Sequence, residues 1–201
     1  MEHVLWKNRI QNFFQLLIFL NYYMTLYALL SVHEDAKHTI DFIEKCRREG
    51  KPFFINMWIH EPHTPFHTVP KYEWRFRALE SREDQIYASV LSHADDRIGQ
   101  VLSTLDRLKL SDHTLVIFSS DNGPARAPQP TELTLQYDTA TGAGWGIGAA
   151  KGLTGGRKGY KSALFEGGIG VPFIARWPGK IAAGKVDRQS IISAVDQLPT
   201  Y

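Results

Sequence analysis

Two short apolar runs, set far apart, limit the folds that this chain can adopt. The runs PFFINMWI at residues 52–59 and LVIFSS at residues 115–120 carry apolar residues almost without alternation. Such runs are typical of strands that are buried on both faces, as in a parallel sheet. A third run, VPFIARWPG at residues 171–179, predicts another strand that ends in a turn.

The segment before the first run has the periodicity of an amphipathic helix. From Glu34 onward, acidic residues lead the segment, basic residues close it and Gly50 follows. This order suits the helix dipole and provides a stop signal. The predicted apolar face consists of Ala36, Ile40, Ile43 and Cys46. We interpret Cys46 as a structural cysteine on this face rather than as a nucleophile.

A second helix is predicted over residues 86–109, and residues 188–201 look like the start of a third. The second helix carries one apolar stripe, formed by Ile86, Val90, Leu91, Ala94, Ile98, Val101, Leu102, Leu105 and Leu108. Helices that alternate with buried strands predict an α/β domain, with a mostly parallel sheet and helices on both faces. In such folds, ligands bind beyond the carboxyl ends of the strands.

The N-terminal segment, residues 1–33, differs from the domain predicted over residues 34–201. Residues 13–32 carry no charge, follow a basic flank and have about the length of a membrane span or signal anchor. Four polar residues interrupt the run: Gln15, Asn21, Thr25 and Ser31. A buried helix, an interfacial helix and sequence foreign to the domain remain alternatives.

Composition excludes several classes of function. The 201 residues carry 23 basic and 21 acidic side chains, so the net charge of +2 offers no strong field for nucleic acid. Hydrophobic residues make up 43% of the chain, which is enough for a core. The single cysteine rules out an internal disulfide and a cysteine-based zinc cluster.

Polar side chains follow the second predicted strand. Asp121 and Asn122 offer a carboxylate and an amide oxygen, which are ligands suited to Ca²⁺ or Mg²⁺. A calcium site takes six to eight oxygens, so further ligands must come from elsewhere. The alternative is a plain turn, because Asp-Asn-Gly-Pro is favourable turn chemistry.

Histidines follow the first predicted strand in a proline-rich loop. His63 lies in PHTP, where an imidazole can donate to an anionic substrate or protonate a leaving group. His60 and His67 share this interpretation, with His67 the weakest candidate. An ordinary surface-loop histidine is the alternative for all three.

A lysine stands among glycines later in the chain. Lys161 lies in GYKSALFEGG, where glycines let backbone approach a ligand and the lysine offers a charge to a sulfate or phosphate oxygen. Lys158 and Arg157 compete for that role, and a solvated lysine is the alternative.

Four segments occur together in an order and spacing that resemble the sulfatase family, within the alkaline-phosphatase-like superfamily. They are PFFINMWIHEPHTPFHTVPKY, LSHADDRIGQVLSTLDRLKLSDHTLVIFSSDNGP, GYKSALFEGGIGVPFIARWPGKI and SAVDQLPT. The resemblance covers roughly residues 34–201 and implies that family's α/β fold. It departs from the family at Gly170, where members often carry arginine.

The resemblance implies a role for each matched residue. Asp121 and Asn122 correspond to two calcium ligands, and Lys161 to the lysine that contacts the substrate sulfate. His63 corresponds to the histidine that touches the sulfate and helps the leaving group depart, with His60 as the runner-up. The implied reaction is calcium-dependent hydrolysis of a sulfate ester on a small molecule or carbohydrate, in a secreted, periplasmic, lysosomal or membrane-anchored protein.

The family's nucleophile motif is missing from these 201 residues. Sulfatases use a formylglycine made within C/S-x-P/A-x-R, and no such motif occurs here; Cys46 lies in KCRREG. The family's N-terminal aspartate pair and C-terminal subdomain are also missing. We therefore expect part of a sulfatase catalytic domain. A catalytically inactive fragment or pseudoenzyme and a phosphoesterase of the same superfamily are the alternatives.

Overall fold

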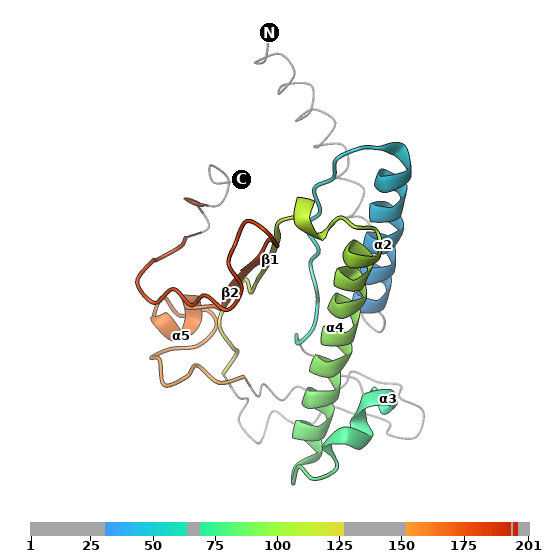
Figure 1. Cartoon of the computed structure of the whole chain (residues 1–201). Coiled ribbons are helices and arrows are strands. Elements are labelled where there is room, and N and C mark those ends of the chain that lie inside the picture. Colours follow the sequence, from blue (N-terminus) through green and yellow to red (C-terminus); the bar gives the residue numbers. More distant parts are fainter. Residues whose placement is uncertain (1–30, 64–68, 127–151, 194, 197–201) are drawn as a thin grey trace.

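The computed structural model describes residues 31–63, 69–126, 152–193 and 195–196 (Figure 1). The helices are α2 (Ser31–Glu49), α3 (Pro70–Glu73), α4 (Arg82–Arg107) and α5 (Glu166–Ile169), with short 3₁₀ turns η1 (Trp74–Phe76) and η2 (Ser111–His113). The strands are β1 (Val116–Ser119) and β2 (Phe173–Arg176). Two of the three predicted strands are thus present in the described residues, and both are shorter than predicted.

Helix α2 confirms the first predicted helix and ends where the sequence indicates. Its buried face holds Val32, Ala36, Thr39, Ile43 and Cys46. Gly50 has a positive φ of 63°, and the amide of Lys51 donates to the carbonyl of Cys46 at 2.9 Å. This is the hydrogen-bond pattern of a Schellman cap. Cys46 is a buried free thiol, as expected for a structural residue.

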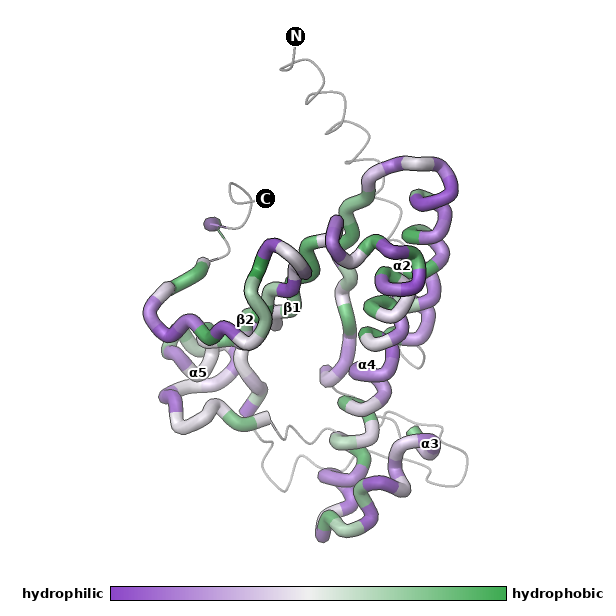
Figure 2. Tube along the Cα trace, in the orientation of Figure 1, coloured by the Kyte–Doolittle hydropathy of each residue, from purple (hydrophilic) through white to green (hydrophobic). Residues whose placement is uncertain are grey.

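Helix α4 begins at a capped residue and packs against α2. The hydroxyl of Ser81 accepts from the amide of Asp84 at 3.0 Å, which satisfies one of the orphan donors of the first turn. The buried residues of α4 are Ile86, Ser89, Val90, Ala94, Thr104 and Leu105. Leu91, which the apolar stripe included, is 40% exposed. Figure 2 shows that polar and apolar residues alternate along both helices.

The predicted strand at residues 52–59 is not formed as a strand. Figure 1 shows an extended run that returns alongside α4. Exposure alternates along it: Phe54 and Trp58 are 58% and 64% exposed, whereas their sequence neighbours are less so. A strand needs a hydrogen-bonded neighbour, and in the described part of the chain the sheet contains β1 and β2 alone.

Strands β1 and β2 form an antiparallel pair in which Phe118 lies opposite Ile174. These two residues are 43% and 58% exposed, so the predicted burial on both faces is not met in the described residues. One antiparallel pair is compatible with a larger mixed sheet, since mostly parallel α/β sheets often carry an antiparallel edge strand.

The two ends of the chain contribute little regular structure to the described residues. Residues 187–193 are irregular, with Asp187 Oδ1 accepting from the amides of Gln189 and Ser190. Residue 194 and residues 197–201, the rest of the predicted third helix, lie outside the described residues, as do residues 1–30. None of the helices that the structure describes is both long enough and apolar enough to cross a bilayer.

The α2–α4 contact predicts which apolar residues carry stability. Ile86 is 1% exposed, so Ile86→Ala should lower the free energy of unfolding by about 2–4 kcal/mol through lost burial and a residual cavity. Leu91→Ala, on the same helix but 40% exposed, should cost less than about 1 kcal/mol. Urea denaturation followed by circular dichroism measures both, and equal losses would contradict this packing.

Candidate functional site

The loop that follows β1 holds Asp121 and Asn122 at the carboxyl end of the strand. The Nδ2 group of Asn122 donates to the carbonyl of Gly123 at 2.8 Å, and the hydroxyl of Ser120 donates to the carbonyl of Asn122 at 3.0 Å. The first bond orients the amide and leaves its Oδ1 oxygen available as an acceptor or ligand. Asp121 is exposed. The loop thus presents two side-chain oxygens from adjacent residues.

Gly123 holds this loop against a distant segment by backbone contact. Its amide donates to the carbonyl of Gly168 at 2.8 Å. A Cβ atom on Gly123 would lie 1.9 Å from the carbonyl oxygen of Gly167, which no side chain could tolerate. Gly167 and Gly168 are equally confined, because a Cβ on either would lie 2.1 Å from a carbonyl oxygen. The glycines that the sequence suggested for close approach to a ligand therefore approach other backbone.

The same contact brings Lys161 to the loop. Its amide donates to the carbonyl of Pro124 at 2.8 Å, so its backbone is tied three residues beyond Asp121. Lys158, which competed for the role, places its ammonium 4.0 Å from the centre of the Phe165 ring, a cation–π arrangement that occupies it. Lys161 is partly buried, whereas Arg157 is exposed. Lys161 is therefore the better placed cation.

His60 and His63 lie together in the loop after the extended run. Their ring centres are 5.3 Å apart, and the amide of His63 donates to the carbonyl of His60 at 2.8 Å. His63 is exposed and His60 is partly buried. Burial, followed by the neighbouring His63, lowers the pKa of His60, while Asp35 opposes the shift. His60 is thus biased toward its neutral form.

Asp35 was not anticipated by the sequence. It lies just after the first turn of α2, and burial together with the nearby charge of Glu61 raises its pKa from the usual 3.8 to about 6. His38 and His60 act in the opposite direction. No local pattern could have indicated this, because Asp35 and Glu61 are brought close only by the packing of α2 beside the loop.

The structure therefore places the predicted residues in two groups. Asp121, Asn122 and Lys161 form one, and His60 and His63 form the other. His67 and residues 127–151, within the loop expected to shape the pocket, lie outside the described residues.

The metal-ligand set is incomplete within the described residues. No three His, Cys, Asp or Glu side chains there are grouped closely enough to hold an ion. Asp121 and Asn122 fit a hard cation in the chemistry of their oxygens, but two ligands fall short of the six to eight that calcium takes.

The family model and the curated relatives that match this chain all indicate the same family. The sulfatase family model matches residues 5–201. Arylsulfatase H of Homo sapiens is 34% identical over 164 residues, which are 82% of this chain and 25% of that protein. N-acetylgalactosamine-6-sulfatase of Canis lupus familiaris is 30% identical over 155 residues, which are 76% of this chain and 25% of that protein. The chain spans about a quarter of the length of the curated relatives it matches.

Solved structures give the fold. The crystal structure of Ps i-CgsB matches 76% of this chain and 29% of its own, at a TM-score of 0.59 and 24% identity. The same protein has been solved in complex with k-i-k-neocarrahexaose, with the same coverage. This likeness confirms the expected fold class, an incomplete α/β domain of the alkaline-phosphatase-like type.

The contact at Gly123 generates a sharp prediction. Gly123→Ala should destabilise the loop, because its Cβ would meet backbone at 1.9 Å and the loop would have to move. The matched control is Gly99→Ala, where nothing lies within 4 Å of the added Cβ; within α4 it should stabilise by about 1 kcal/mol. Amide hydrogen exchange at Gly123 and Lys161 measures loop opening. Unchanged protection in Gly123→Ala would contradict the contact.

Asp35 generates a prediction about pH. Its folded-state pKa of about 6 lies above the usual 3.8, so its contribution to stability is complete below about pH 3.8 and is lost as the pH rises through about 6. Asp35→Asn should therefore stabilise the protein at pH 8 by roughly 1–2 kcal/mol, discounted for partial exposure, and not at pH 4.

Thermal melts across this pH range measure the effect. Asp41→Asn is the matched control, since Asp41 lies on the exposed part of the same helix and pairs with Lys37 at 2.9 Å. It should give no such gain. A gain at pH 8 from both variants would contradict the assigned environment of Asp35.

Proposed function

This chain belongs to the sulfatase family, and from that premise we propose that it carries the metal- and sulfate-binding part of a sulfuric ester hydrolase. The observation that supports this best is the backbone tie between the loop of Asp121 and the segment of Lys161. This tie joins the backbone of the segment that carries Lys161 to the loop that carries Asp121 and Asn122. The carboxylate, the amide oxygen and the ammonium of these residues form a set suited to a cation and to the anionic ester that it neutralises.

We assign Asp121 and Asn122 as two ligands of a calcium ion. The carboxylate of Asp121 is exposed, and the amide of Asn122 is oriented by its bond to Gly123, so both oxygens are available. Calcium bound there would offset negative charge on the sulfate oxygens and orient the ester.

Lys161 and His63 act on the substrate in this proposal. The ammonium of Lys161 holds a sulfate oxygen as a point charge. His63, exposed in its loop, donates a proton to the oxygen of the departing alcohol. His60 is the runner-up for this step. The lowered pKa of His60 reduces the fraction of its imidazole that carries a proton to donate at neutral pH.

We propose a sulfated carbohydrate as the substrate. Five of the matched relatives are named N-acetylgalactosamine-6-sulfatase or N-acetylgalactosamine-6-O-sulfatase, and one matched structure was solved in complex with k-i-k-neocarrahexaose. The activity of the whole protein is part of the same proposal, since the matched relatives are about four times longer than the matched segment.

An inactive fragment is the second candidate, and one observation favours it. No C/S-x-P/A-x-R motif occurs in the 201 residues, and without a formylglycine there is no covalent route for sulfate transfer. A phosphoesterase of the same superfamily is the third candidate.

The test is hydrolysis of 4-methylumbelliferyl sulfate by the product of the full-length message that encodes residues 34–201. Lys161→Ala and His63→Ala should each lower kcat/KM by about 10²-fold or more. Their matched controls, Lys158→Ala and His60→Ala, should stay within about fivefold, and a calcium chelator should abolish turnover.

Three results would contradict the proposal. A loss in His60→Ala without one in His63→Ala would transfer the acid role to His60. Faster turnover of 4-methylumbelliferyl phosphate would favour the phosphoesterase. No turnover by a correctly folded product would favour the inactive fragment.

A further inference from the structure

The corner formed by α3 and η1 presents an aromatic ring and cations to solvent. Trp74 is 60% exposed. The guanidinium carbon of Arg75 lies 5.7 Å from the centre of the Trp74 ring and 5.6 Å from that of Tyr72. Arg75 thus lies within cation–π distance of both rings and is held near the surface.

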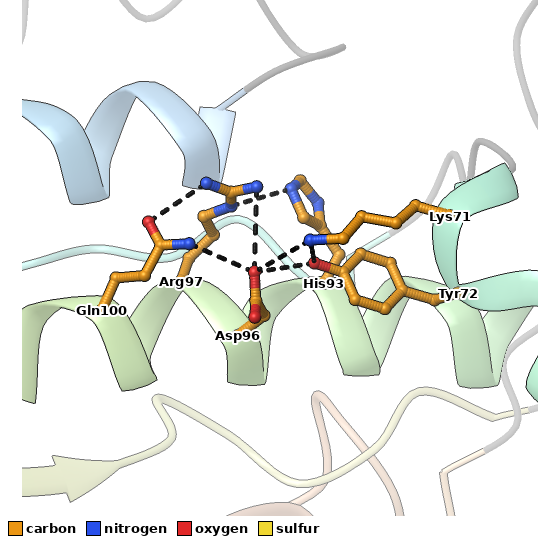
Figure 3. A network of polar contacts seen from close by, with 6 residues as sticks. All are labelled: Lys71, Tyr72, His93, Asp96, Arg97 and Gln100. Carbon is orange, nitrogen blue, oxygen red and sulfur yellow. Dashed lines mark hydrogen bonds and ion pairs between the residues drawn. The ribbon is translucent and has the colours of Figure 1, made fainter. Parts of the chain in front are cut away.

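This corner is anchored to α4 by a polar network (Figure 3). Tyr72 is 2% exposed, and its hydroxyl donates to Asp96 Oδ2 at 2.7 Å. The ammonium of Lys71 donates to the same hydroxyl at 3.0 Å and lies 3.6 Å from Asp96 Oδ2. Hydrogen bonds to Tyr72 and the positive charge of Lys71 lower the pKa of Asp96, which keeps this anchor ionised. The exposed Trp74 ring therefore follows directly after a segment that is held to α4 by this network.

Asp96 and Glu73 form ion pairs in which Arg75 and Arg77 take no part. Asp96 is shared by Lys71 and Arg97, and Glu73 pairs with Arg82. Among the described residues, no carboxylate forms an ion pair with Arg75 or Arg77, and both arginines are exposed. Both guanidinium groups therefore lie within three residues of an exposed indole.

A single exposed aromatic residue needs no explanation by itself. Here an exposed ring, a guanidinium within cation–π distance of it and a second exposed guanidinium occur on one anchored turn. A sugar ring packs its apolar face on an indole, and guanidinium groups bind sulfate oxygens in a bidentate manner. Nucleic acid would also meet positive charge here, but the corner offers two cations, too few for the many phosphate contacts that such binding uses.

We propose that Trp74, Arg75 and Arg77 form a binding site for one sulfated sugar unit, separate from the Asp121–Lys161 group. Helix α4 has 26 residues, or about 39 Å at 1.5 Å per residue; α3 packs beside it and β1 follows its far end. Such a site would hold a long chain while another unit is presented for cleavage. The choice of a sulfated carbohydrate rests on the function proposed above.

The test is fluorescence polarisation with a fluorescein-labelled carrageenan hexasaccharide and its desulfated counterpart, using this 201-residue chain. Wild type should bind the sulfated probe at least about tenfold more tightly. Trp74→Ala and Arg75→Gln should each weaken binding by about five- to tenfold. The matched controls are Trp58→Ala and Arg48→Gln, an exposed tryptophan and an exposed arginine elsewhere, and these should stay within about twofold.

Three outcomes would overturn the site: equal affinity for the desulfated probe, an unchanged affinity in Trp74→Ala, or tighter binding of a single-stranded DNA of matched charge. Circular dichroism of each variant separates loss of binding from loss of fold. Binding requires no turnover, so the affinity is measured independently of hydrolysis. An inactive protein that still binds through Trp74 would contradict only the proposed hydrolysis, and an active protein that fails to bind would contradict only this site.

Discussion

The contact between Gly123 and the Gly167–Gly168 pair determines where the candidate site can form. It is a contact of backbone with backbone, because a carbonyl oxygen occupies the space that a Cβ of Gly123 would need. The hydrogen bonds from Gly123 to Gly168 and from Lys161 to Pro124 follow from that approach. Segments about forty residues apart in sequence are thereby held together, and the backbone of Lys161 is tied to the loop that carries Asp121 and Asn122.

The helices could be predicted from the sequence because their causes are local. Three- and four-residue spacing, the cap at Ser81 and the stop at Gly50 all act within a few residues. Strands depend on a neighbour that sequence does not identify. Residues 52–59 have the composition of a buried strand, but in the described part they lie extended with Trp58 exposed. The run at 115–120 did find a partner, and pairing made four of its residues a strand.

The candidate site could be predicted only in part, for a similar reason. Asp121, Asn122 and Lys161 stand in short motifs with recognisable turn and glycine chemistry, so sequence indicates them. The motifs did not reveal that the glycines contact one another rather than a ligand. The environment of Asp35 could not be predicted, since it arises only when the N-terminal part of α2 packs near Glu61 and His60. The hydrogen bond between Tyr72 and Asp96, which lie 24 residues apart, could not be predicted from the sequence either.

Two effects compete at Asp35, and their balance links the core to the histidine loop. The neighbouring imidazoles of His38 and His60 favour the negative charge of Asp35. Burial and the charge of Glu61 oppose it, and the raised pKa shows that these unfavourable effects are larger. A proton on Asp35 or on His60 relieves part of the cost, because each charged form favours the other. The loop that carries His63 therefore experiences the protonation state of a residue on α2, and α2 is fixed by its packing on α4. The two-helix core thus contributes to the electrostatics of the loop as well as to its position.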